Sequence, residues 1–91
     1  MSLKNLIAQI DPKMEWLNKI LEEIPIEIEG EDYLKLKVKV TGEVVHLEPI
    51  KGQISRIILR EELDSVNYGA LRRGEPLTFK YKGLKFLIKH R

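Results

Sequence analysis

The chain has 91 residues, no cysteine and a formal net charge of +2. This length supplies one hydrophobic core, so we expect residues 1–91 to form a single domain. The lack of cysteine excludes disulfide bonds, thiolate nucleophiles and Cys-ligated zinc, and a small domain without disulfides is typical of a reducing compartment. No apolar stretch approaches the roughly 18 residues of a membrane span, nor does the N-terminus read as a signal peptide. We therefore expect a cytoplasmic protein that does not contact a membrane.

Charged residues make up 33% of the chain, above the roughly 25% typical of soluble domains. The excess comes from Lys and Glu, accompanied by many Ile and Leu. This composition favours a heat-adapted organism, in which surface ion pairs form more easily. An ordinary Lys/Glu-rich mesophilic protein is the alternative.

The charge is distributed unevenly along the chain. Residues 1–65 contain nine Lys or Arg and thirteen Asp or Glu, whereas residues 66–91 contain seven and one. A basic C-terminal segment favours an anionic partner. It equally favours attraction between the two halves of the chain.

Two N-terminal helices, or one kinked helix, are predicted over roughly residues 2–24. Apolar residues recur at helical spacing on both sides of Asp11-Pro12, where Asp suits an N-cap and Pro suits the first helical position. Pro25 ends the helix, because the residue before a proline avoids the α region. From there the apolar period changes to two, which predicts strands beginning with Ile26–Ile28.

Two hairpins are predicted. The first joins 34–40 to 43–47 through a turn at Thr41-Gly42, which places Val38 opposite Val45 and Lys37 opposite His46. The second joins 77–81 to 84–88 through Lys82-Gly83. It sets one face apolar and places Lys80 opposite Lys85 on the other.

Residues 53–73 carry a mixed pattern. We predict a strand to about Leu59 and a helix from about Arg60 to Arg72, ended by Gly74; a single helix from Gln53 is the alternative. The whole pattern predicts the α+β class, with an N-terminal helix or helix pair packed on a mainly antiparallel sheet of four or five strands built from hairpins.

Catalytic machinery is not apparent in the sequence. His46 and His90 stand outside any zinc-ligand spacing, no serine lies in a G-x-S-x-G motif, and no glycine-rich phosphate loop is present. We expect a protein that is not an enzyme, with no metal, no cofactor and no small-molecule substrate.

The basic C-terminal hairpin is the candidate nucleic-acid-binding site, with residues Arg72, Arg73, Lys80, Lys82, Lys85 and Lys89. Lysines directly opposite each other are unfavourable, and a phosphate backbone would offset them. A neighbouring strand bearing Glu27 and Glu29 would also offset them, as would plain exposure to solvent. The hairpin's aromatic residues are expected in the core, which argues against base stacking.

One segment resembles a known family. Gly74-Glu75-Pro76-Leu77-Thr78-Phe79, with Gly83 following, is similar to the helix–"GEP"–hairpin segment of prevent-host-death antitoxins. The resemblance implies binding to operator DNA and to a partner toxin. It covers residues 63–88, under a third of the chain, and lies at the opposite end from its position in those antitoxins. We carry over no residues from it.

Three functions of different classes follow. The first is a small non-enzymatic binding or accessory domain, with non-specific nucleic-acid binding through the basic hairpin. The second is a structural or protein–protein interaction module, acting as a homo-oligomer or as a subunit of a larger complex. A homodimer would cover exposed strand edges, and Trp16 is a candidate for burial in it. A small enzyme is the least supported of the three.

Overall fold

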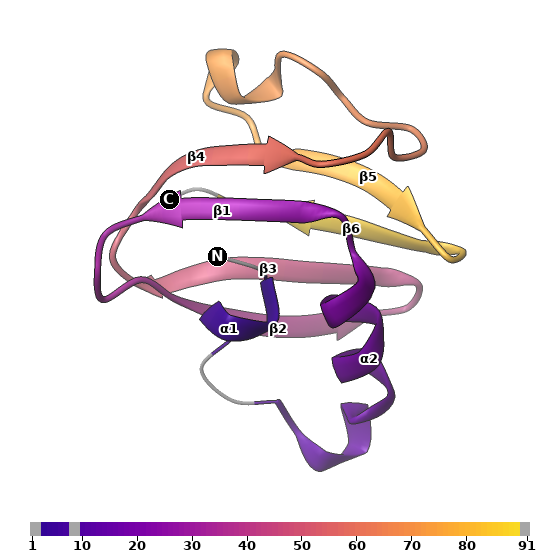
Figure 1. Cartoon of the computed structure of the whole chain (residues 1–91). Coiled ribbons are helices and arrows are strands. Elements are labelled where there is room, and N and C mark those ends of the chain that lie inside the picture. Colours follow the sequence, from indigo (N-terminus) through magenta and orange to yellow (C-terminus); the bar gives the residue numbers. More distant parts are fainter. Residues whose placement is uncertain (1–2, 8–9, 90–91) are drawn as a thin grey trace.

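The computed structural model describes residues 3–7 and 10–89 and shows short N-terminal helices packed with strands in two sheets (Figure 1). The elements are α1 (Leu3–Leu6), η1 (Pro12–Met14), α2 (Trp16–Glu23), β1 (Ile26–Gly30), β2 (Lys35–Thr41), β3 (Val44–Lys51), β4 (Ile54–Leu59), η2 (Ala70–Arg73), β5 (Leu77–Tyr81) and β6 (Leu84–Ile88). The α+β class is confirmed. No helix within the described ranges is long and apolar enough to cross a membrane.

The larger sheet has the order β2-β3-β6-β5, and β1 and β4 form a separate antiparallel pair. Two antiparallel hairpins, β2–β3 and β5–β6, make up the larger sheet, and a parallel pairing of β3 with β6 joins them. Antiparallel pairing therefore dominates, as predicted. The parallel pair is the exception that brings the two hairpins side by side.

The helical region near Asp11-Pro12 and its end at Pro25 agree with the prediction, but the first helix is shorter than predicted: it stops at Leu6, and Ile7 pairs with Leu36 in a parallel bridge. The Asp11 side chain accepts a hydrogen bond of 2.9 Å from the backbone N–H of Lys13 and caps η1. Ile24 takes an extended conformation (ψ 122°) directly before Pro25, which ends α2.

The second hairpin has the predicted register, with Phe79 opposite Phe86 and Lys80 opposite Lys85. Its turn residues Lys82 and Gly83 both have positive φ (51° and 80°), as a type I′ turn requires.

The predicted register of the first hairpin is wrong by two residues. Its turn is Gly42-Glu43, so Val38 faces Leu47 and Lys37 faces Glu48. Gly42 adopts φ +62° at the first turn position, a conformation that glycine takes far more readily than threonine. A shift of two residues keeps every side chain on its predicted face.

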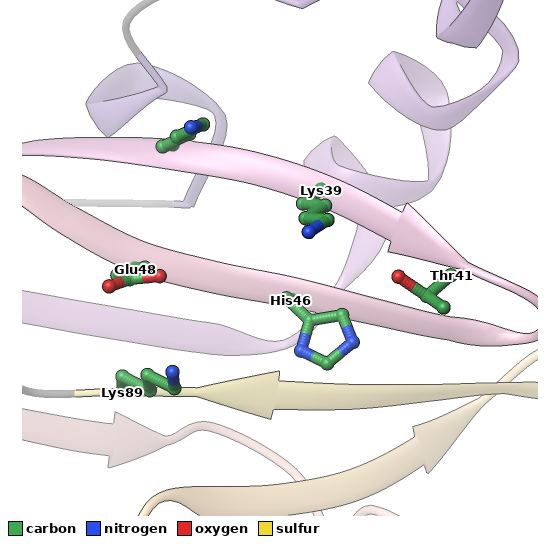
Figure 2. Close-up of a pocket in the computed structure, with 6 residues that line it drawn as sticks. Lys39, Thr41, His46, Glu48 and Lys89 are labelled. Carbon is green, nitrogen blue, oxygen red and sulfur yellow. The ribbon is translucent and has the colours of Figure 1, made fainter.

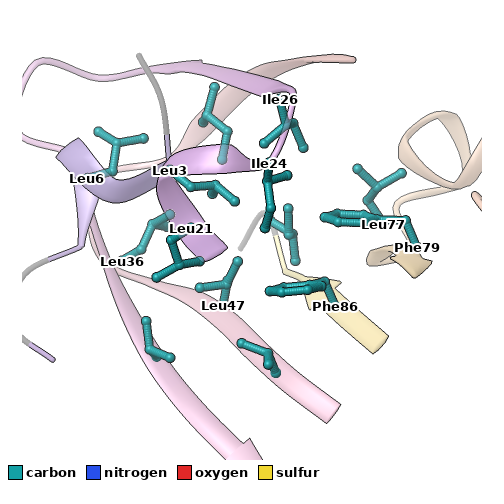
Figure 3. Packing of buried hydrophobic residues seen from close by; sticks show 14 of the residues in the cluster. Leu3, Leu6, Leu21, Ile24, Ile26, Leu36, Leu47, Leu77, Phe79 and Phe86 are labelled. Atoms are coloured by element: carbon teal, nitrogen blue, oxygen red, sulfur yellow. The ribbon is translucent and has the colours of Figure 1, made fainter. Parts of the chain in front are cut away.

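One hydrophobic core lies between the larger sheet and the layer formed by the helices and the β1–β4 pair (Figure 3). The buried rings of Phe79 and Phe86 stack within this core, with centroids 5.2 Å apart and planes 9° from parallel. Leu17 and Leu21 of α2 and Leu47 of β3 are fully buried. The opposite face of the larger sheet, which we call the outer face, takes no part in this core.

The strand at 54–59 is confirmed, but the helix predicted from Arg60 to Arg72, and the alternative helix from Gln53, are wrong. Ser65 and Gly69 have positive φ (55° and 87°), which an α-helix does not allow. The segment instead runs along the free edge of β5, where the Lys80 N–H donates to the Asp64 carbonyl at 2.7 Å. Leu63 and Ala70 are the buried apolar residues that connect this segment and η2 to the interior.

Candidate nucleic-acid interface

The outer face is organised in three rows that cross the larger sheet. Because side chains alternate along a strand, residues paired across the ladder share a face. The rows are Thr41–Val44–Lys85–Lys80, Lys39–His46–Leu87–Thr78, and Lys37–Glu48–Lys89. Lys89 directly follows β6, and its N–H donates to the Leu47 carbonyl at 2.9 Å.

Lysines dominate this face. Five exposed lysines lie in the three rows, Lys37, Lys39, Lys80, Lys85 and Lys89, and Lys35 lies on the same face of β2 beyond them. Within residues 3–7 and 10–89, none of the five forms an ion pair. Glu48 is the one carboxylate in the three rows, and Asp64 lies opposite Lys80 at the end of the first row. The five lysines outnumber these two carboxylates, so the outer face carries an excess of positive charge.

An open pocket of about 410 Å³ lies on the outer face. Its lining comes from β2, β3 and the residue after β6, as Figure 2 shows: Lys37, Lys39, Thr41, His46, Glu48 and Lys89. Lysine ammonium groups and a threonine hydroxyl are hydrogen-bond donors that suit phosphate oxygens. The Glu48 carboxylate lies among them and would repel an anion placed directly over it.

The structure separates the six predicted binding residues into two groups. Lys80, Lys85 and Lys89 lie on the outer face, as the strand alternation predicts. The other three lie elsewhere: Lys82 in the β5–β6 turn, and Arg72 and Arg73 on η2.

Two of the residues outside the outer face are already engaged by carboxylates. Arg73 forms an ion pair with Glu75 at 3.1 Å, and Lys82 forms one with Glu23. The hydrogen bond from Lys82 lowers the pKa of Glu23, and the same contact raises the pKa of Lys82. These two cations are therefore poorer candidates for binding a phosphate than the lysines of the outer face.

Lys37 and Lys39 were not among the predicted binding residues, yet the parallel β3–β6 pairing brings them into the same rows as the β5–β6 lysines. The alternation of lysine with apolar residues in 35–40 is a signal that both share a face. Nothing in that alternation indicates which strand lies next to β3, so the sequence did not link the two groups.

The alternative in which Glu27 and Glu29 offset the Lys80–Lys85 repulsion does not agree with the ion pairs of the structure. These carboxylates form ion pairs with Arg60 and Arg56 across the β1–β4 sheet. The acidic residue beside the lysine pair is Asp64, which lies opposite Lys80 in an antiparallel bridge at the edge of β5.

The described part of the chain offers no exposed ring of Phe, Tyr or Trp on the outer face for a base to stack on, and no cluster of metal ligands. The three rows of the outer face contain no Phe, Tyr or Trp, and the Tyr81 hydroxyl donates toward the Glu23 carbonyl, 3.5 Å away. No group of three His, Cys, Asp or Glu residues gathers to hold a metal among residues 3–7 and 10–89. The predicted tail histidine, His90, lies outside the described residues.

No protein-family model, no curated protein and no solved structure matches this chain. The resemblance of residues 63–88 to prevent-host-death antitoxins thus gains no support. The helix that it implies before Gly74 is replaced by an irregular segment and the short η2.

Proposed function

We propose that this protein is a non-catalytic, cytoplasmic binding domain that holds the phosphate backbone of nucleic acid against the outer face, without regard to sequence. The observation that carries the proposal is the set of five exposed lysines in the three rows of the larger sheet, none of which forms an ion pair with another described residue. Four strands at about 4.8 Å spacing make this face roughly 14 Å wide. Several phosphates of one backbone fit on such a surface.

The composition of the face supports backbone binding rather than recognition of bases. Arg or Lys can read guanine and Asn or Gln reads adenine through paired hydrogen bonds, and single-stranded bases stack on aromatic rings. The three rows contain no Arg, Asn or Gln and no Phe, Tyr or Trp. Lysine binds phosphate as a point charge and carries little sequence information.

A double substitution tests the proposal. Lys39→Glu with Lys85→Glu reverses one charge on each hairpin of the outer face. The matched control, Lys13→Glu with Lys19→Glu, makes the same change in net charge on exposed residues of η1 and α2. Binding to a mixed-sequence duplex is measured by fluorescence anisotropy over a range of salt concentrations.

We expect wild-type affinity to fall steeply as the salt concentration rises. If all five lysines contact phosphates, the slope of log K against log salt should approach about −4.5, and fewer contacts should make it shallower. The outer-face variant should lose detectable binding, and the control should keep most of it. Equal losses in both variants, or an affinity independent of salt, would contradict the proposal.

Protein–protein interaction is the second candidate, and Trp16 favours it. This side chain is 50% exposed at the start of α2, whereas tryptophan is usually largely buried. A homodimer that buries Trp16 is the simplest form of such an interaction. Sedimentation equilibrium tests it: the mass should exceed the 10.6 kDa of one chain and return to it in Trp16→Ala. A wild-type mass of one chain at all concentrations removes this candidate.

A further inference from the structure

A second pocket, of about 520 Å³, lies between β4 and the segment around η2. Figure 1 shows the η2 segment passing beside β4, with β5 close by. The lining residues are Arg56, Ile57, Leu59, Tyr68, Gly69, Arg72 and Leu77. None of the five outer-face lysines is among them, so this pocket is separate from the proposed nucleic-acid interface.

The pocket has an apolar floor. Leu77 is only 4% exposed, and Ile57 and Leu59 pack partly buried against the core. The partners of these two residues on β1, Ile28 and Ile26, are 1% and 3% exposed. The floor is thus a part of the hydrophobic core that remains open to a ligand, and the volume lies within the usual range of small-molecule sites.

The rim carries one aromatic ring and one available cation. Tyr68 is 64% exposed. Arg56 is held by Glu29 at 3.1 Å, whereas Arg72 forms no ion pair with any residue in the described ranges. The backbone N–H of Arg72 donates to the Gly69 carbonyl at 3.1 Å. This bond leaves the Arg72 guanidinium free of it and stabilises the turn that carries Tyr68 and Arg72.

We infer that this pocket binds a small amphipathic anion, whose apolar body lies on the floor and whose carboxylate, phosphate or sulfonate contacts Arg72. Burial of an apolar body on Ile57, Leu59 and Leu77 supplies affinity. The planar guanidinium of Arg72 matches an anionic head through two parallel hydrogen bonds. The inference stands independently of nucleic-acid binding, because it rests on different residues.

Anilinonaphthalene sulfonate is the probe, since it joins an aromatic body to one anionic group and fluoresces in apolar surroundings. We expect saturable binding, with NMR shifts in the methyl groups of Ile57, Leu59 and Leu77. Arg72→Gln should weaken binding about tenfold or more, as expected for a lost hydrogen bond between charged groups. Arg73→Gln is the matched control on the same short helix, and it should change affinity less than twofold because Arg73 is held by Glu75.

Two further measurements complete the test. N-phenylnaphthylamine, the same body without the sulfonate, should bind wild-type protein at least tenfold more weakly. The outer-face variant Lys39→Glu with Lys85→Glu should bind the sulfonate probe like wild type. Non-saturable binding, shifts at other methyl groups, equal effects of Arg72→Gln and Arg73→Gln, or equal affinity for the neutral probe would each overturn the inference. So would competition between probe binding and self-association, because a second copy would then occupy the pocket.

Discussion

Val45 on β3 lies directly beside Phe86 on β6, in the parallel ladder that joins the two hairpins of the larger sheet. Both side chains are fully buried. Because side chains alternate along each strand, burial of this pair turns Val44 and Lys85 to the outer face. A contact in the hydrophobic core thereby places the lysines of β2 in the same rows as those of β5 and β6.

Phe86→Ala should destabilise the protein strongly. Phe86 is 0% exposed and stacks on Phe79, and removal of a buried aromatic ring usually costs about 3–5 kcal/mol. That is a large part of the roughly 5–15 kcal/mol that holds a typical domain folded. Urea denaturation measures the loss.

Leu87→Ala is the control for this prediction, since Leu87 neighbours Phe86 but lies half-buried on the outer face. It should reduce the free energy of unfolding much less. Similar losses in the two variants would show that the Phe79–Phe86 stack is not central to the core.

The β5–β6 hairpin could be predicted residue by residue because its partners are neighbours in the chain and Lys82-Gly83 specifies its turn. The register of the first hairpin was less well specified by the sequence, because a turn at Thr41-Gly42 and a turn at Gly42-Glu43 both leave the apolar residues on one face. Alternation therefore predicted which side chains share a face and left the register open by two residues.

The sequence could not reveal the pairing of β3 with β6 or the path of residues 60–69. Alternation records which face a residue occupies but contains no information on the next strand in the sheet, so Lys37 and Lys39 were missed. Leu63, Val66 and Ala70 have helical spacing, yet the same apolar residues serve a segment that packs over the edge of β5. Here tertiary contacts outweighed local helix propensity.

Asn67→Ala should weaken the contact between the segment after β4 and the edge of β5. The Asn67 side chain accepts from the Thr78 N–H at 2.7 Å and donates to the Pro76 carbonyl at 3.0 Å, and so acts as a strand partner. Loss of both bonds leaves part-buried backbone groups unpaired, at about 1–3 kcal/mol. Hydrogen exchange at the Thr78 amide should accelerate. Asn67→Asp keeps the acceptor and should protect this amide better than alanine does; equal exchange in wild type and Asn67→Ala would contradict the assignment.

Lys82→Gln should raise the pKa of Glu23 toward its ordinary value, because the hydrogen bond from Lys82 is the main cause of the lowered pKa. A lowered carboxyl pKa stabilises the fold above the ordinary pKa, and this contribution disappears as the pH falls through the lowered value. The stability difference between wild type and variant should therefore shrink under acid conditions.

An NMR titration of the Glu23 carboxyl carbon measures this shift. Lys19→Gln is the control: Lys19 acts on Glu23 only through its charge and is the smallest of the causes, so it should move the pKa less. An unchanged Glu23 pKa in Lys82→Gln would show that the contact does not persist in solution.

Lys85→Glu should move stability and nucleic-acid binding in opposite directions. It replaces the like-charged pair Lys80–Lys85 by an opposite pair, which should stabilise the hairpin by about 0.2–1 kcal/mol. The same change removes a cation from the outer face, so the slope of log K against log salt should become shallower by about 0.7–0.9 for each lost phosphate contact. Thermal denaturation and salt-dependent anisotropy on one variant measure both.

Two related variants separate the contributions of repulsion and attraction at this position. Lys85→Gln removes the repulsion without creating an ion pair, so its stability should lie between wild type and Lys85→Glu. Lys80→Glu with Lys85→Glu restores a like-charged pair, now beside Asp64, so it should lose the stability gain and also abolish binding. If Lys85→Glu instead destabilises the protein while nucleic-acid affinity stays at the wild-type value, Lys85 serves the fold and the outer face does not bind phosphate through it.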